Sequence, residues 1–316
     1  MEVLLQIGLL VIGFVMLIKG ADWFVEGASK IADKLGIPQL VIGLTIVAMG
    51  TSAPETAVSI SAALKGSADI AVGNVVGSNI MNILVILGIT SIIIPLSVQK
   101  STVKYEIPFM IIITVIFAVL GLTDNEIFRG DGLILLGLFI IYLAYLFRMA
   151  KKGQAVTEEV EEDGKQDSVL KMIVLIVIGV VLIVLGSNVS VDAAKTLATI
   201  FGMDEKLIGL TIVALGTSLP ELVTSVTAGL KGKADIAIGN IVGSNIFNIL
   251  FVIGVSAMIT PVTYQAAFLF DSIVCVAAAV LLFVCVLNKD NKLKRWSGIT
   301  MLVGYAAYLG YMIVNM

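Results

Sequence analysis

Two glutamates, Glu55 and Glu221, lie inside long apolar stretches and are the residues best suited to chemistry in this sequence. Each ends a copy of one motif, which reads G-L-T-I-V-A-M-G-T-S-A-P-E at 43–55 and G-L-T-I-V-A-L-G-T-S-L-P-E at 209–221. A carboxylate in an apolar helix is costly to bury and by default marks a functional site. Two carboxylates in equivalent places predict one shared site.

The two motifs belong to an internal duplication of residues 42–88 and 208–254. Roughly two thirds of the aligned positions are identical, as expected for repeated structural units. A second repeated element follows each glutamate. It reads G-N-V-V-G-S-N-I-M-N-I-L at 73–84 and G-N-I-V-G-S-N-I-F-N-I-L at 239–250. Each copy therefore brings two oxygen-rich segments to the predicted site.

Prolines in the first element predict helix breaks. Pro54 and Pro220 have no amide hydrogen, so each frees the carbonyl four residues earlier, at Gly50 or Gly216. Free carbonyls at membrane depth persist only where they are buried in protein or line a polar cavity. Hydroxyl and amide side chains at helical spacing add further oxygens, and these candidate ligands are Thr51, Ser52, Ser78, Asn82, Thr217, Ser218, Ser244 and Asn248.

The donor set consists of oxygen atoms, and the sequence contains no histidine. Such a set favours hard cations such as Na⁺ and Ca²⁺. The two glutamates would neutralise one Ca²⁺; when emptied they would repel each other and require Na⁺ or H⁺ instead. A site that cannot stay empty is the basis of obligatory exchange. Asn79, Asn245 and the neighbouring glycines are expected to serve helix packing or capping.

The composition indicates which class of fold holds these residues in place. The chain has 316 residues, is 59% hydrophobic and 14% charged, and has a mean hydropathy of +1.07, which is typical of a polytopic membrane protein. We expect an all-α membrane protein with ten transmembrane helices, at 3–29, 37–64, 68–96, 106–123, 131–149, 169–200, 205–230, 235–260, 267–287 and 296–314.

The acidic segment 150–168 divides the chain into a first five-helix repeat, 1–149, and a second, 169–316. With the N-terminus outside, most Lys and Arg residues fall on one side, so we expect both termini outside and this linker in the cytoplasm. Because five is an odd number, the second repeat enters the membrane from the opposite side. The prediction is two inverted five-helix repeats, an architecture of secondary transporters.

The paired G-T-S-x-P-E and G-N-x-x-G-S-N-I segments resemble the alpha repeats of the calcium/cation antiporter superfamily, and most closely the prokaryotic sodium/calcium exchangers. The resemblance includes G-A-D-W-F-V-E-G-A-S-K-I-A at 20–32. It implies an antiporter of the prokaryotic cell (inner) membrane whose first and sixth helices slide across a core. It also implies that Glu55 and Glu221 bridge Ca²⁺, while the hydroxyls and amides above and the carbonyls of Ala48 and Ala214 complete flanking Na⁺ sites.

Asn248 departs from some relatives, which carry aspartate at this position; two carboxylates rather than three argue against K⁺ cotransport. We interpret the chain as an antiporter that exchanges Ca²⁺ for Na⁺ by alternating access, with a Ca²⁺/H⁺ antiporter as the alternative. An intramembrane aspartyl protease would need paired aspartates, and a cation channel is also disfavoured. The protein is thus not expected to be an enzyme. Its expected partners are Ca²⁺, Na⁺ or H⁺ and the lipid bilayer, with no cofactor, no nucleic acid and a monomeric state.

Overall fold

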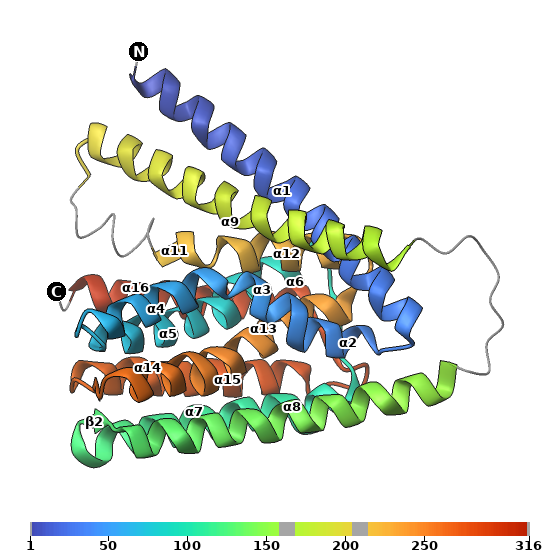
Figure 1. Cartoon of the computed structure of the whole chain (residues 1–316). Coiled ribbons are helices and arrows are strands. Elements are labelled where there is room, and N and C mark those ends of the chain that lie inside the picture. Colours follow the sequence, from blue (N-terminus) through green and yellow to red (C-terminus); the bar gives the residue numbers. More distant parts are fainter. Residues whose placement is uncertain (1, 158–167, 204–213, 315–316) are drawn as a thin grey trace.

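The computed structural model describes residues 2–157, 168–203 and 214–314, except for the side chains of 154–157, 214 and 267. Most of these residues are helical (Figure 1). Within these ranges, eight helices are long and apolar enough to cross a membrane, and a bent helix pair at Gln39–Leu64 would make a ninth span. The chain is therefore a mostly helical membrane protein. The predicted helix at 205–230 lies partly outside the described residues.

The first half starts with one long helix and continues through a broken span that contains the first motif. Its elements are α1 (Glu2–Leu35), α2 (Gln39–Ile42), the π-helix η1 (Gly43–Val47), α3 (Ala48–Thr51), α4 (Ala53–Leu64), α5 (Asp69–Met81), the π-helix η2 (Asn82–Leu87), α6 (Gly88–Ile93), β1 (Leu96–Ser97), the π-helix η3 (Thr102–Glu106), α7 (Ile107–Asp124), β2 (Glu126–Ile127) and α8 (Arg129–Thr157).

The second half follows the same order in its described part, except that no π-helix there corresponds to η3. Its elements are α9 (Val169–Ile200), α11 (Ala214–Thr217), α12 (Leu219–Leu230), α13 (Ala234–Phe247), the π-helix η5 (Asn248–Ile253), α14 (Gly254–Ile259), β3 (Val262–Thr263), α15 (Ala267–Val286), β4 (Lys292–Leu293) and α16 (Arg295–Val314).

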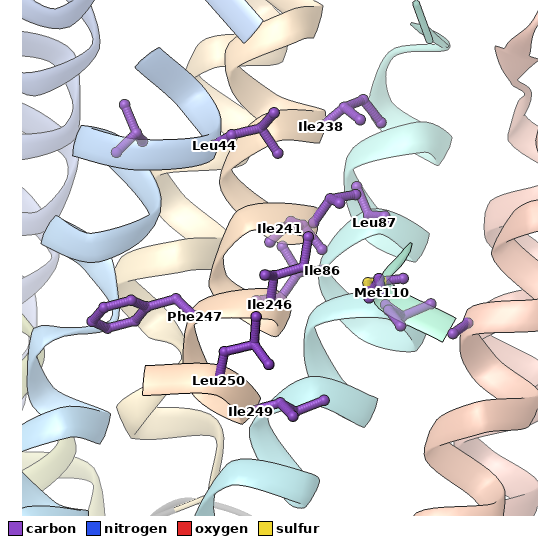
Figure 2. Close-up of a cluster of buried hydrophobic side chains, with 14 of the residues drawn as sticks. Leu44, Ile86, Leu87, Met110, Ile238, Ile241, Ile246, Phe247, Ile249 and Leu250 are labelled. Atoms are coloured by element: carbon purple, nitrogen blue, oxygen red, sulfur yellow. The ribbon is translucent and has the colours of Figure 1, made fainter. Parts of the chain in front are cut away.

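The spans that carry the second motif element form the centre of the molecule. In the most apolar 18-residue window of the span Asp69–Ile93, 78% of the residues are buried, and in that of Ala234–Ile259, 94% are buried. The corresponding share for α1 is 17%. Figure 2 shows Ile86 and Leu87 of η2 beside Ile241 and Ile246 of α13, all fully or almost fully buried. Apolar packing therefore holds together the two helices that also present the polar motif residues.

Helices α1 and α9 form a separate layer that crosses over the motif helices (Figure 1). Glycines bring their backbones into contact: a Cβ atom on Gly20 would lie 2.8 Å from the carbonyl oxygen of Gly179, and one on Gly186 would lie 2.8 Å from that of Gly13. Small residues at such contacts are typical of helix packing in membranes.

Two short antiparallel ladders link the halves. Strand β1 pairs with β4, with Leu96 opposite Leu293, and β2 pairs with β3, with Ile127 opposite Val262. The four named leucine, isoleucine and valine side chains are buried almost completely. The loops before α7 and α8 are therefore anchored to loops of the second half.

Candidate cation site

Each motif proline lies at the start of a new helix segment, directly after a residue that interrupts the helix. The first break lies at Ser52 (φ −81°, ψ 12°) and the second at Ser218 (φ −92°, ψ 4°). The axis bends by 52° between Gln39–Thr51 and Ala53–Leu64. Glu55 and Glu221 lie in the first turns of α4 and α12, each only 1% exposed. The positive ends of two helix dipoles thus lie beside the two carboxylates.

Each glutamate is held by a hydroxyl of the opposite copy. Ser52 Oγ donates to Glu221 Oε1 at 2.8 Å, and the side chain of Thr217 hydrogen-bonds to Glu55. The two carboxylates are also close enough to repel each other when charged. The structure therefore brings the two predicted glutamates together. Ser52 precedes Glu55 by three residues, a spacing that in an unbroken helix gives a shared face, but its hydroxyl donates to Glu221 of the other copy.

Two asparagines fix the backbone of the glutamates. Asn74 Nδ2 donates to the carbonyl oxygen of Glu55 at 3.1 Å and to Ser59 Oγ at 2.9 Å. Asn240 repeats the arrangement, donating to the carbonyl oxygen of Glu221 at 3.4 Å and to Ser225 Oγ at 2.9 Å. These bonds dock α4 on α5 and α12 on α13.

Four further amides form a crossed network between the central helices. Asn79 and Asn245 each donate to the other's backbone carbonyl, at 3.1 and 3.2 Å. Asn82 Nδ2 donates to Asn245 Oδ1 at 2.9 Å, and Asn248 Nδ2 donates to Asn79 Oδ1 at 3.1 Å. The packing role expected for Asn79 and Asn245 is thus accompanied by a second one, since their oxygens hold the amide nitrogens of Asn82 and Asn248.

This network leaves buried acceptors with no partner among the described residues. They include Glu55 Oε2, Glu221 Oε2, Asn82 Oδ1 and Asn248 Oδ1, and each of the four residues is at most 1% exposed. Buried polar atoms nearly always have a partner, so each exception requires an explanation. All four belong to residues that the sequence identified as cation ligands, and a desolvated cation would satisfy them.

The remaining candidates lie around these four. The carbonyl oxygen of Ala48 accepts from Thr51 Oγ1 at 3.2 Å and from Ser244 Oγ at 3.3 Å. Thr51 Oγ1 also lies 2.9 Å from Asn240 Oδ1. Ser218 is buried, and its hydroxyl has no hydrogen bond among the described residues. Ala214 begins α11, which contributes its backbone to the second break.

A cavity of about 670 Å³ leads to this group of residues. It runs along α5 from Asp69, at the start of the helix, to Ser78 and Met81, and Asn74 and Thr217 also line it. Ser78 and Thr217 are two of the predicted ligands. The cavity therefore reaches the part of the predicted ligand set that Ser78 and Thr217 form.

The sequence missed one contact of the second break. Ser187 Oγ of α9 donates to the carbonyl oxygen of Gly216 at 2.7 Å. This is the carbonyl that Pro220 was predicted to free. The sequence does contain a difference that could have indicated this contact. In the aligned segments Gly20-Ala21 and Gly186-Ser187, only the second has a hydroxyl side chain.

Comparison with known proteins shows the family to which the chain belongs. The sodium/calcium exchanger protein family matches residues 5–148 and 171–314. Inner membrane protein YrbG of Escherichia coli is 39% identical over 82% of this chain and 81% of its own length. Sodium/calcium exchanger MaX1 of Methanosarcina acetivorans is 34% identical over 95% of this chain and 96% of its own length.

A solved structure of the sodium-calcium exchanger NCX_Mj superposes with a TM-score of 0.84 at 33% identity. The superposition covers 98% of this chain and 99% of that one. Together with the match over both halves of the sequence, the shared fold identifies the class of protein. The chain belongs to the sodium/calcium exchanger family and is a membrane antiporter rather than an enzyme.

Proposed function

We propose that the protein exchanges Ca²⁺ for Na⁺, with Ca²⁺ held between Glu55 and Glu221. The observation that carries this proposal is that four buried acceptor oxygens, two from carboxylates and two from amides, make no hydrogen bond among the described residues. Ca²⁺ takes about six to eight oxygen ligands at flexible geometry. Two carboxylates, two amides and adjacent hydroxyls and carbonyls supply that number without sulfur or imidazole.

Charge explains why the exchange would be obligatory. Two buried carboxylates neutralise one Ca²⁺, and the pair without a cation would leave like charges close together in a low-dielectric environment. Leaving the site is therefore favourable for Ca²⁺ only when Na⁺ enters. For the flanking Na⁺ positions we propose Thr51, Ser52, Ser78, Asn82, Thr217, Ser218, Ser244 and Asn248, with the carbonyls of Ala48 and Ala214.

We also propose ten transmembrane helices in two inverted five-helix repeats, 1–149 and 169–316, joined by the linker 150–168 in the cytoplasm. Both termini would face outside. The repeated order of elements around α5 and α13 supports two equivalent halves. The name of the relative YrbG supports a place in the inner membrane. Alternating access would involve movement of the glycine-packed pair α1 and α9 across the motif helices.

The test is isotope flux in proteoliposomes in which Na⁺, K⁺ and pH gradients are imposed separately. We expect a Na⁺ gradient to drive Ca²⁺ uptake, and a membrane potential to change its rate because three Na⁺ against one Ca²⁺ would move net charge. Uptake driven by a pH gradient without Na⁺ would identify the alternative, a Ca²⁺/H⁺ antiporter. Absence of Ca²⁺ movement under every gradient would overturn the proposal.

A further inference from the structure

A third buried carboxylate lies outside the proposed exchange site. Glu106 ends η3, is 1% exposed, and belongs to the candidate span Thr102–Asp124. An ionisable side chain within a membrane span usually has a functional partner. The exchange mechanism does not use Glu106, so its partner must be found elsewhere.

The duplication does not repeat a carboxylate at the position of Glu106 itself. When Pro95 is aligned with Pro261 and Gln99 with Gln265, the position of Glu106 is taken by Ser272. Ser272 Oγ accepts a hydrogen bond from Tyr264 at 2.7 Å and is buried in the second half. The second half instead has a carboxylate one residue earlier, Asp271, which accepts a hydrogen bond from Tyr308 at 2.9 Å.

The contacts of Glu106 leave acceptor capacity unused. Tyr145 donates to Glu106 Oε1. Glu106 Oε2 makes no hydrogen bond among the described residues, although the hydroxyl of Thr102, one turn earlier, is close enough to interact with this carboxylate. The hydroxyl of Tyr142, a residue only 3% exposed, also makes no hydrogen bond among them. A buried carboxylate oxygen beside an unsatisfied phenol is a site for a group that donates several hydrogen bonds.

These polar groups lie along a groove of about 390 Å³ between the η3–α7 segment and α8. Phe109, Ile112 and Ile141 provide its apolar walls. Ile112 is 55% exposed and Ile141 is 63% exposed, so the groove opens to the outer surface of the helix bundle, where lipid would surround it. The ring of Phe109 stacks on that of Tyr142 at 5.7 Å, which closes the inner wall.

A basic side chain lies at the opening of the same groove. Lys104 lines it, and its Nζ is 5.3 Å from the centroid of the Tyr105 ring. Thr102 begins the span, and Glu106 is one helical turn further along, about 6 Å by helical rise. The groove therefore lies within one helical turn of the start of the candidate span, with Lys104 at its rim and Glu106 at its base.

We propose that this groove binds a phospholipid with a primary ammonium headgroup, such as phosphatidylethanolamine. The ammonium group donates to Glu106 and Tyr142, the phosphate contacts Lys104, and an acyl chain lies on Phe109, Ile112 and Ile141. A choline headgroup carries no N–H donor. A glycerol headgroup brings a negative charge without the ammonium, and Glu106 would disfavour it.

Native mass spectrometry of the full chain in detergent micelles tests the proposal, with phosphatidylethanolamine, phosphatidylcholine and phosphatidylglycerol of identical acyl chains added at equal concentrations. We expect preferential retention of phosphatidylethanolamine. Glu106→Gln should lower that retention by about tenfold, to the level of phosphatidylcholine, because a charge-assisted bond is lost. Asp290→Asn is the matched control, since Asp290 is exposed in the loop before β4, which pairs with β1 ahead of η3.

A second variant separates loss of the ligand from loss of the fold. Ile112→Trp fills the apolar part of the groove without changing the carboxylate, so it should lower retention of all three lipids in a protein that still elutes as a single species. Equal retention of the three lipids by the unmodified protein would overturn the proposal. So would a phosphatidylethanolamine preference that survives Glu106→Gln, or a preference for phosphatidylglycerol. These readouts do not require ion exchange, so they stand apart from the test of the proposed function.

Discussion

Two equivalent glycines of the central helices, Gly243 of α13 and Gly77 of α5, have different described neighbours. The first copy lies tightly on α13: a Cβ atom on Gly243 would be 2.8 Å from Ala48 Cβ, and Thr51 Oγ1 lies 2.9 Å from Asn240 Oδ1. The corresponding glycine of α5 is Gly77, which lines the cavity and has no described atom within 4 Å of a Cβ added there. Residues 204–213, which include the counterpart of η1, lie outside the described part of the chain.

The described neighbours of the two glycines therefore differ, while the counterparts of Leu44 and Ala48 belong to residues whose side chains are not described. The described cavity reaches the candidate site along α5, where Ser78 and Thr217 line it. The corresponding side of α13 is filled by η1 and α3. Because both sides carry the same residue types, we infer that each can adopt the arrangement of the other. Alternating access would then be an exchange of two packings of similar energy.

The glutamates provide the largest expected effect and test whether the two copies contribute equally. Glu55→Gln and Glu221→Gln each remove one of two charges that neutralise Ca²⁺, so Ca²⁺ flux in proteoliposomes should fall by about a hundredfold or more in both. Glu126→Gln, in the β2 turn, is the control and should keep normal flux. Normal transport by either motif variant would contradict the assignment of the site.

Asn248→Asp tests the amide network with a smaller expected effect. The substitution adds a third carboxylate and removes the Nδ2 donor that lies 3.1 Å from Asn79 Oδ1. We expect the dependence of flux on Na⁺ concentration and on pH to change, with about a tenfold shift in apparent cation affinity. Asn82→Asp makes the equivalent change in the first copy. An unchanged profile in both variants would remove these amides from the ligand set.

The sequence predicted correctly those features that depend on a single copy of the motif. The duplication, the helix breaks before Pro54 and Pro220, and the burial of both glutamates followed from spacing and composition. The oxygen-only donor set followed from residue type. The family resemblance is confirmed by the match over both halves of the chain.

Contacts between the copies could not be predicted in the same way. That Ser52 bonds to Glu221, and that Asn79 and Asn245 hold Asn248 and Asn82, depends on how two helices 166 residues apart meet. Spacing within one helix identifies a shared face but not its partner. Glu106 was missed for the same reason, because only its position beside α8 distinguishes it from an ordinary interfacial acid.

The two glycines of the central helices test the packing difference directly. Gly243→Ala places a methyl group 2.8 Å from Ala48 Cβ and Leu44 Cα, and overpacking of this kind costs about 1–3 kcal/mol of stability. Gly77→Ala adds a methyl group that meets no described atom within 4 Å and should leave the thermal midpoint unchanged. If the cavity closes against α5 during transport, however, Gly77→Ala should slow Ca²⁺ flux.

The measurement is a thermal unfolding curve for each variant in detergent, combined with flux in proteoliposomes. Equal loss of stability in both variants would mean that the two sides are packed alike in solution. Normal flux for Gly77→Ala would mean that α5 is not a closing surface.

Ser187 provides the smallest expected effect and bears on why the two breaks differ. Its hydroxyl donates to the carbonyl oxygen of Gly216 at 2.7 Å, whereas the aligned residue of α1 is Ala21, which cannot donate. Ser187→Ala would make the two halves alike at this point and remove one hydrogen bond, at a cost of about 1 kcal/mol.

The bond links α9 to the second break. If α9 moves during transport as proposed, loss of the bond should also change the Ca²⁺ flux by a few-fold. Ser187→Thr keeps the hydroxyl and should restore both stability and flux if the bond is the cause. A Ser187→Ala protein with unchanged flux and midpoint would show that the Gly216 carbonyl is satisfied equally well in another way, and that the difference between the two copies arises from their packing on α5 and α13 alone.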